Sequence, residues 1–319
     1  MQTKKKTLIE NLKVNEIVDD IFVVKFKKPV EQYKNGFKFE LRLADSSGEI
    51  MYKFWGPNNE PLVQGLYDSI KDGDVVYAQG RMNEWNERLE ISSNNDYDIH
   101  VLKEEDYDPK EFIRKSEKSI PQMMEQLNHY IDSIQDAEIK RLINYFFKNE
   151  SFVSKFRHWP AAMYIHHAWI GGLLEHTLNV LKTCDFIQKN HFKLNRDLLF
   201  AGAIFHDFGK LKEFEISTTI KVTNEGMMIG HVMLGLDMVN AAMEELNIKD
   251  ELRLKIRHMI LTHMGEYGSN KTPSFPEALA VYYADKMDGD LDHMQDLMKN
   301  AKTDDDYIYT KHYGNVYLK

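Results

Sequence analysis

The sequence has 319 residues, with 41 Lys and Arg against 50 Asp and Glu, so its formal net charge is −9. A chain of this length corresponds to roughly two domains of about 100–200 residues each. Apolar residues make up 43% and charged residues 29%, a balance that excludes wholesale disorder. A disulfide scaffold is also excluded, because Cys184 is the single cysteine.

The hydropathy pattern gives no sign of a membrane protein. No stretch approaches the roughly 20 apolar residues that a membrane span needs. The beginning, MQTKKKTLIENLKVNE, has basic residues but lacks the apolar core of a secretory signal. We therefore expect a cytoplasmic protein with no membrane partner.

The first hundred residues have the pattern of β-structure. Short runs rich in β-branched and aromatic residues are separated by turn clusters such as Asp45-Ser46-Ser47-Gly48. Strands are predicted at residues 21–26, 37–43, 49–55, 75–80 and 88–91. Five short strands in about 100 residues fit a small closed barrel of the OB type. Strand counting leaves an SH3-like barrel open as the alternative.

From about residue 108 the pattern changes to helices. Asp108-Pro109 predicts a helix start, and Pro121 opens an apolar-periodic run that continues to Ile134. Helical patterns extend to about residue 300, apart from a short hairpin arm expected at residues 216–222. The expected fold class is thus multidomain, β followed by α. Its expected parts are an OB-type barrel at 1–105, a helical linker or start of the helical domain at 106–150, an all-α domain at 151–300, and a tail of unassigned structure at 301–319.

One dipeptide in the helical region has the chemistry of a metal site. His206 and Asp207 follow an apolar run at residues 198–205, and Gly209 comes shortly after them. A buried helix that ends at these two residues would hold two ligands in fixed geometry. Imidazole and carboxylate together suit a divalent ion such as Mn, Fe, Co or Zn. No cysteine accompanies them, which disfavours a structural zinc knuckle.

Other polar residues also lie at the ends of apolar helical runs. They are His176 in GGLLEHT, His231 after Gly230, His263 after the run at 254–261, and Asp285 at the end of ALAVYYAD. An unpaired buried charge is costly, so a carboxylate in the position of Asp285 should be paired or ligating. Asp288 follows one turn later and either supports the ligands or faces solvent.

These motifs, taken in order, resemble a known family. The spaced pattern of His176, His206-Asp207 and Asp285 resembles the HD-domain superfamily of metal-dependent phosphohydrolases. The fuller series also includes HH at 166–167, HDFGK, GHVMLG, THMG and YADKMD, all behind an OB-like barrel. This series resembles the YhaM-like 3′→5′ exonucleases of bacteria and archaea over about residues 15–300. Met264 departs from the pattern, because the bacterial members are expected to carry a second His after His263.

The resemblance implies an HD-domain helical bundle with a metal centre. The implied ligands are His176, His206, Asp207 and Asp285 for a first ion, and His231 and His263, with Asp207 bridging, for a second. The expected cofactor is Mn²⁺, as one or two ions, with Fe²⁺ or Co²⁺ able to substitute. Asp207 and Lys210 are the expected catalytic residues. The Lys210 ammonium would neutralise the scissile phosphate, although a lysine at a helix end is also commonly only solvated.

Substrate contacts are expected from both domains. His166 and His167 are candidates for holding substrate phosphate, and the alternative for His167 is a core position beside Trp169. Aromatic side chains on an OB face stack on bases, and basic ones contact phosphates. Residues 1–53 carry eleven Lys and Arg against eight Asp and Glu, whereas 54–100 carry three against nine. The barrel candidates are Phe37, Phe39, Trp55, Lys38 and Arg42, with a place in the barrel core as the alternative for each aromatic.

The expected function is a metal-dependent 3′→5′ exonuclease that hydrolyses phosphodiester bonds of single-stranded RNA or DNA through an activated water. One alternative is an HD-type nucleotide or cyclic-nucleotide phosphohydrolase, and another is a nucleic-acid-binding module with a structural metal site. The barrel favours the exonuclease, because a mononucleotide enzyme does not need one. A helicase or another repair or decay protein is the candidate protein partner, and the oligomeric state is left open.

Overall fold

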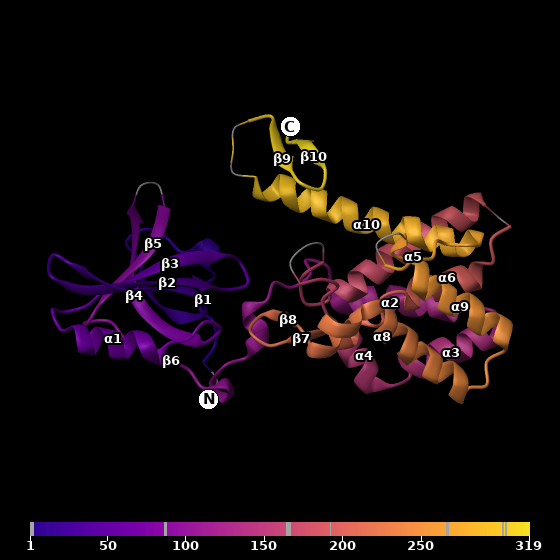
Figure 1. Ribbon diagram of the computed structural model, residues 1–319, viewed down its shortest axis with the longest axis horizontal. Coiled ribbons are helices and arrows are strands. Elements are labelled where there is room, and N and C mark those ends of the chain that lie inside the picture. The colour runs from indigo at the N-terminus through magenta and orange to yellow at the C-terminus, as the bar shows by residue number, and fades with distance from the viewer. Residues whose placement is uncertain are drawn as a thin grey trace. The chain divides into compact units, whose positions relative to one another are not determined.

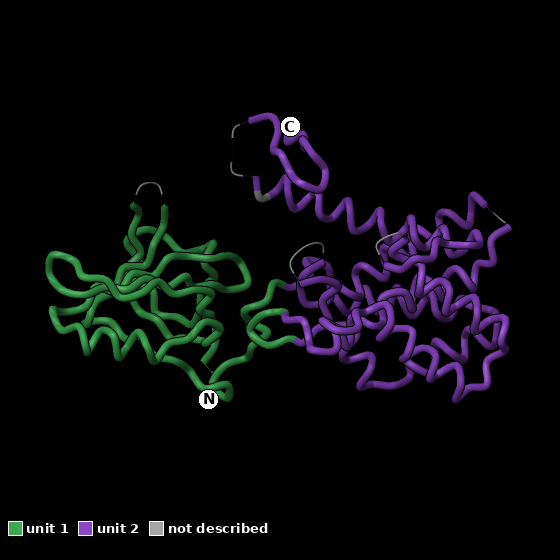
Figure 2. Tube along the Cα trace, viewed as in Figure 1, with its two compact units in different colours: residues 1–114, 216–220 green, residues 115–215, 221–319 purple. Residues whose placement is uncertain are grey.

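The computed structural model describes residues 3–85, 88–163, 167–191, 193–265, 268–301, 303 and 305–319. Figure 1 shows its helices and strands. The chain divides into two compact units (Figure 2). Unit 1 comprises residues 1–114 and 216–220, and unit 2 comprises residues 115–215 and 221–319. Each unit has a hydrophobic core of its own.

Unit 1 is built on a six-stranded sheet. Its strands are β1 (Ile17–Tyr33), β2 (Gly36–Ala44), β3 (Glu49–Trp55), β4 (Val75–Trp85), β5 (Arg88–Asn94) and β6 (Ile99–Val101). They pair in the order β1-β2-β3-β5-β4-β6, and β1 also pairs with β4, so the first five strands form a closed ring. β3 and β5 run parallel, and helix α1 (Glu60–Ser69) connects β3 to β4. The predicted OB-type fold is confirmed, while α1 and β6 were absent from the sequence prediction.

Alternation along β2 shows how the sequence builds this ring. Phe39, Leu41 and Leu43 are fully buried, and the intervening Lys38 and Arg42 lie on the outer face. β1 pairs with β4 through its first half and with β2 through its second half, and its register with β2 shifts near Val24 and again near Lys28. Such irregularities bend a strand and increase its twist, which ring closure requires.

Unit 2 is a helical bundle, as predicted. Its helices are α2 (Ile120–Asp132), α3 (Ala137–Phe147), α4 (Glu150–Phe156), α5 (Gly172–Asn190), α6 (Arg196–Phe205), α7 (Lys210–Glu213), α8 (Asn224–Glu245), α9 (Asp250–Thr262) and α10 (Pro276–Asn300). α6 packs against α3, α5, α9 and α10, and every residue from Leu198 to Phe205 is buried. The helix start predicted at Asp108 is a short 3-10 turn, Pro109–Phe112, capped by the Asp108 side chain.

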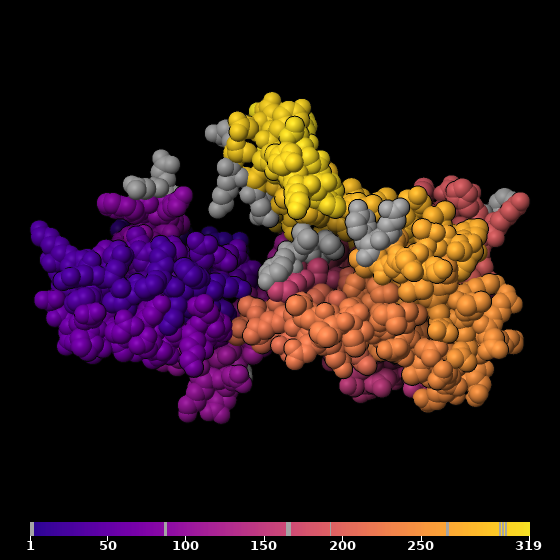
Figure 3. Space-filling view, in the orientation of Figure 1, coloured from indigo at the N-terminus to yellow at the C-terminus, as the bar shows by residue number. Residues whose placement is uncertain are grey.

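Two hairpins accompany the bundle. β7 (Phe214–Ile216) and β8 (Ile220–Val222) confirm the hairpin arm predicted from the sequence. β9 (Tyr307–Thr310) and β10 (Gly314–Tyr317) give the C-terminal tail a structure that the sequence prediction left open. This second hairpin follows α10 and forms the yellow projection in Figure 3. It is joined to α10 by the Tyr313 hydroxyl, which donates to the main-chain carbonyl of Asp290 at 3.2 Å.

Within the described residues, one helix is long and apolar enough to cross a membrane by length and composition alone. This helix is α8, and the expectation that the chain has no such stretch was therefore too strict. Core helices of folded domains satisfy the same criterion. α8 packs against α7 and α9 and contains a non-helical residue, Gly230, which are features of a bundle helix.

Candidate metal centre

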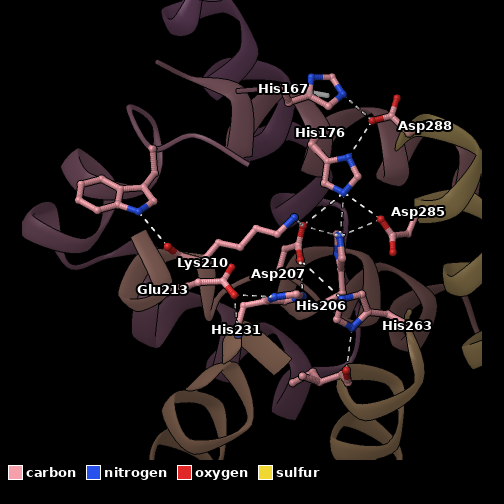
Figure 4. A network of polar contacts seen from close by, with 12 residues as sticks. His167, His176, His206, Asp207, Lys210, Glu213, His231, His263, Asp285 and Asp288 are labelled. Carbon is pink, nitrogen blue, oxygen red and sulfur yellow. Dashed lines mark hydrogen bonds and ion pairs between the residues drawn. The ribbon is translucent and has the colours of Figure 1, made fainter. Parts of the chain in front are cut away.

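The bundle brings all six predicted metal ligands together (Figure 4). They come from α5 (His176), the end of α6 (His206 and Asp207), α8 (His231), the residue after α9 (His263) and α10 (Asp285). The apolar residues of α6 hold this helix in the core. The backbone of His206 continues the helix, so the side chains of His206 and Asp207 extend into the buried centre of the bundle.

Two glycines help to place His231 at the centre, one where α8 approaches the start of α7 and one within α8. A Cβ atom at Gly209 would collide with the main-chain carbonyl of His231, so only glycine fits at this crossing. Gly230 has a φ of 77° and interrupts the helix one residue before His231. The sequence HDFGK and the Gly-His step of α8 therefore act together in positioning this ligand.

The first group of ligands consists of His176, His206 and Asp285. The Nε2 atom of His176 lies 3.1 Å from Nε2 of His206 and 3.1 Å from Oδ1 of Asp285. The Oδ2 atom of Asp207 lies 3.4 Å from each of these two imidazole nitrogens. Both rings and both carboxylates thus direct their ligand atoms toward one point.

The second group consists of Asp207, His231 and His263. The Oδ1 atom of Asp207 lies 3.5 Å from Nε2 of His263 and 3.7 Å from Nε2 of His231. The two oxygens of Asp207 therefore face different groups, which is the arrangement of a bridging carboxylate. Among the described residues, the buried Nε2 atom of His231 has no hydrogen-bond partner, so this nitrogen is available to a ligand.

The opposite ring nitrogen of each ligand histidine is held by an acceptor. Nδ1 of His206 lies 2.9 Å from the carbonyl of Ala203, and Nδ1 of His263 lies 2.7 Å from the carbonyl of Ile260. A carbonyl only accepts, so each Nδ1 carries the proton and each Nε2 presents a lone pair to the centre. Metal-binding histidines are commonly oriented in this way.

The charges of the centre favour ionised carboxylates. Burial alone would raise the pKa of Asp207, but the Lys210 ammonium and His206 hold it well below its usual range. Burial likewise opposes ionisation of Asp285, yet contacts with His176 and His206 lower its pKa to about 2. Burial lowers and the facing carboxylates raise the pKa of His176, with a net rise to about 10. The ionised carboxylates of Asp207 and Asp285 place negative charge between the histidines, which suits the binding of a metal cation.

These residues fit a divalent metal ion. Within each of the two groups, the ligand atoms lie within 4.8 Å of one another. All six donors are imidazole nitrogens or carboxylate oxygens, the set that borderline and hard divalent ions prefer. Cys184 lies on α5, where burial raises the pKa of its thiol, and it belongs to neither group.

Lys210 lies beside Asp207, at the oxygen that faces the first group. Its Nζ atom is 2.6 Å from Oδ2 of Asp207. Its main-chain carbonyl accepts a hydrogen bond of 2.9 Å from Nε1 of Trp159, so the first turn of α7 is fixed in place. Trp159 was not among the sequence candidates, because nothing in its neighbourhood marks a tryptophan as the support of a lysine 51 positions later.

The two histidines predicted to hold substrate phosphate have different outcomes. His166 lies outside the described residues. His167 is buried, its ring packs against Trp169, and its Nε2 lies 2.8 Å from Oδ2 of Asp288. This placement matches the core alternative, and a phosphate contact for His167 stays a prediction. Glu213 was missed by the sequence reasoning: its Oε1 lies 3.2 Å from Nδ1 of His231.

The barrel candidates separate into buried and accessible side chains. The prediction that Phe39 contacts nucleic acid is wrong, because its ring is fully buried and stacks on Phe54 inside the core. Phe37 is partly buried against the same core. Trp55 is partly exposed and packs edge-on against Tyr33, with ring centroids 5.0 Å apart. Among the predicted aromatics, Trp55 is therefore the best placed for stacking on a base.

The predicted basic stripe on the barrel is interrupted by carboxylates. Lys38 pairs with Glu31 at 2.8 Å, and Arg42 lies 3.4 Å from Glu49. Glu40, between the two cations on the same face of β2, pairs with Lys28 at 2.7 Å. Phosphate contacts by Lys38 and Arg42 stay predictions, and such contacts would have to compete with these ion pairs.

The chain is similar to several known proteins and to one family of domains. The HD domain family matches residues 173–290. The chain is 31% identical over 274 residues to the 3′-5′ exoribonuclease YhaM of Geobacillus sp. (strain WCH70), across 84% of this chain and 81% of that protein. It is 30% identical over 295 residues to the 3′-5′ exoribonuclease YhaM of Bacillus subtilis (strain 168), across 91% and 90%. Among solved structures, the second OB-fold domain of replication protein A from Methanococcus maripaludis is 23% identical, with a TM-score of 0.26, across 31% of this chain and 95% of that one.

Proposed function

We propose that this chain, which belongs to the YhaM family of 3′→5′ exoribonucleases, shortens single-stranded RNA from its 3′ end. Membership makes it a metal-dependent 3′→5′ exonuclease, a hydrolase of phosphodiester bonds. The observation that carries the proposal is the convergence of four histidines on the two oxygens of the buried Asp207, with Asp285 beside His176. RNA is the preferred strand because both relatives are named exoribonucleases.

We propose Mn²⁺ as the ion, with Fe²⁺ or Co²⁺ able to replace it in vitro, because nitrogen and oxygen ligands without a thiolate suit all three. The first ion would be held by His176, His206 and Asp285, and the second by His231 and His263, with Asp207 shared. Bound there, divalent ions supply positive charge that polarises a phosphoryl oxygen and acidifies water near neutral pH.

The chain's own cation would act beside this centre. The Lys210 ammonium is mostly buried against Asp207, where screening by water is weak. A scissile phosphate entering the centre would bring a non-bridging oxygen within reach of this ammonium. Charge that develops on the phosphate during hydrolysis would then be stabilised by a group already in place. The Trp159 hydrogen bond keeps the Lys210 backbone fixed while its side chain changes partner.

We propose that the barrel holds the unpaired strand. Trp55, Tyr33 and Lys38 form a cluster on one face, with Nζ of Lys38 5.1 Å from the centre of the Trp55 ring. A base can stack on such a ring whatever its identity, which suits an enzyme that shortens strands of any sequence. A helicase or another decay protein is the proposed partner, because stacking requires unpaired bases. The proposed location is the cytoplasm, where the RNA substrates of such an enzyme are found.

The test uses metal-stripped protein reloaded with Mn²⁺ and matched 5′-labelled single-stranded RNA and DNA. We expect a ladder that shortens from the 3′ end, faster for RNA, absent without metal and absent for a 3′-blocked strand. Faster shortening of DNA would overturn the choice of RNA. Intact strands beside hydrolysed mononucleotides would instead support the nucleotide phosphohydrolase alternative.

A further inference from the structure

Asp288 contacts His167 and His176 behind the first group of ligands (Figure 4). Its Oδ2 atom lies 2.7 Å from Nδ1 of His176 and 2.8 Å from Nε2 of His167. Its Oδ1 atom accepts a hydrogen bond of 2.9 Å from the amide of Asn179. Asp288 is one helical turn beyond the ligand Asp285 on α10, so the two carboxylates contact opposite nitrogens of the same imidazole.

The hydrogen bonds fix the orientation of the His176 ring. An ionised carboxylate only accepts, so both histidine nitrogens that face Oδ2 must donate. Nδ1 of His176 therefore carries a proton, which leaves Nε2, facing His206 and Asp285, as the nitrogen that would give its lone pair to the proposed ion. A histidine that donated from Nε2 instead would direct a hydrogen at the proposed ion.

His167 is fixed by its main chain rather than by its ring. Its φ is 55°, a left-handed conformation that is uncommon for residues other than glycine. Its amide donates to Oδ2 of Asp292 at 2.9 Å, and its carbonyl accepts from the amides of Ala161 and Trp169. A Cβ at Gly172 would collide with this carbonyl, so the turn is closely packed. The left-handed backbone of His167 is thus held by these contacts, and it places the imidazole ring against Asp288.

The geometry of His167 favours the core position over a contact with substrate. The residue is 2% exposed, and its Nε2 atom is occupied by Asp288. The second ligand group offers a parallel, because Glu213 lies against Nδ1 of His231 as Asp288 lies against Nδ1 of His176. Each group thus contains one histidine with a carboxylate behind it, and such a partner raises the basicity of the ligating nitrogen.

We infer that Asp288 and His167 are positioning residues for the proposed ion at His176. Asp288 orients the His176 ring and increases its affinity for the ion, and His167 holds the Asp288 carboxylate in place. This inference rests on the proposed metal function. The effect of each residue on metal affinity can be measured separately from its effect on folding.

The main experiment titrates metal-stripped full-length protein with Mn²⁺, using calorimetry together with the electron paramagnetic resonance signal of free Mn²⁺. For the wild type we expect two sites. Asp288→Asn should weaken one site by about 10–100-fold, the range found when a partner behind a metal-binding histidine is lost. The other site should be unchanged in Asp288→Asn and weakened in the double variant with Glu213→Gln. Asp290→Asn makes the same chemical change on the same helix and should bind as the wild type does.

A second pair of variants separates positioning from structure. His167→Leu removes the donor to Asp288 and should weaken the same site, whereas His167→Gln keeps a donor and should recover most of the affinity. Equal affinity in Asp288→Asn and wild type, or equal loss in both His167 variants, would overturn the inference. If Asp288→Asn fails to fold, the His167 pair decides. A wild type that binds no Mn²⁺ would overturn the proposed metal function as well.

Discussion

The ligand cluster of unit 2 and the outer face of the barrel use the same kinds of charged side chains under opposite conditions. Asp207 and His206 are almost fully buried, so their polar atoms have few possible partners besides each other and an ion. Arg42 and Glu49 are about half exposed, and water can replace either partner. An exposed ion pair typically contributes about 0–1 kcal/mol, whereas an unpaired buried charge costs several. Burial therefore limits the side chains of the cluster to pairing with one another or with an ion. Exposure lets the charged side chains of the barrel exchange their partners for water.

The largest effect is expected where both ligand groups meet. Asp207→Ala removes the carboxylate that faces both groups, so exonuclease activity should fall by more than about 100-fold, beyond what loss of an outer partner costs. The rate of nucleotide release from labelled RNA measures this. Circular dichroism of the variant should match that of the wild type. Retained activity with an unchanged fold would contradict the assignment of the metal centre.

Lys210 tests whether a fixed cation acts beside the metal ligands. Lys210→Met keeps the apolar stem but removes the ammonium, and kcat should fall by about 10²–10³-fold, as for loss of one preorganised electrostatic donor. Lys210→Arg, which keeps the charge, should retain more activity. Steady-state kinetics on a short RNA distinguish this from weaker binding, because a change confined to KM would argue for a binding role alone.

Two aromatic residues of the barrel separate core packing from strand binding. Trp55→Ala should weaken binding of single-stranded RNA by about 1–3 kcal/mol, the value of one stacked base, with little loss of stability. Phe39→Ala should instead lower the free energy of unfolding by about 3–5 kcal/mol, because it empties a buried position. Fluorescence anisotropy with labelled RNA and urea unfolding measure the two effects. If the two variants behaved in the reverse way, the faces assigned to these residues would be incorrect.

The smallest effect is expected for the exposed cation of β2. Arg42→Gln should change the free energy of unfolding by no more than about 0.5 kcal/mol, since its pair with Glu49 lies in water. If Arg42 contacts a phosphate, the slope of log affinity against log salt should decrease by about 1. RNA binding measured at several salt concentrations tests this. An unchanged slope would remove Arg42 from the interface.

The candidate metal ligands were predictable from the sequence. The residues that form hydrogen bonds to the far side of those ligands mostly were not. His176, His206, Asp207 and Asp285 stand beside apolar helical runs, where a polar side chain is conspicuous because burial without a partner is costly. Neither Glu213, in KLKEFE, nor Asn179, in TLNVL, stands at the end of an apolar helical run. Only the crossing of α7 with α8 and of α5 with α10 brings them to His231 and Asp288.

The sequence by itself determined the order of the elements, the β-then-α division and the candidate metal ligands, because hydrophobic periodicity and the cost of burying polar groups act locally along the chain. Only the tertiary structure decided which nitrogen of each imidazole faces the candidate metal centre and which aromatic side chain lies in the barrel core. Closure of the ring buries Phe39 and leaves Trp55 partly exposed, although both are aromatic residues of predicted strands. Packing of α10 against α5 places Asp288 behind His176. Such contacts join residues more than 100 positions apart, and no local pattern records them.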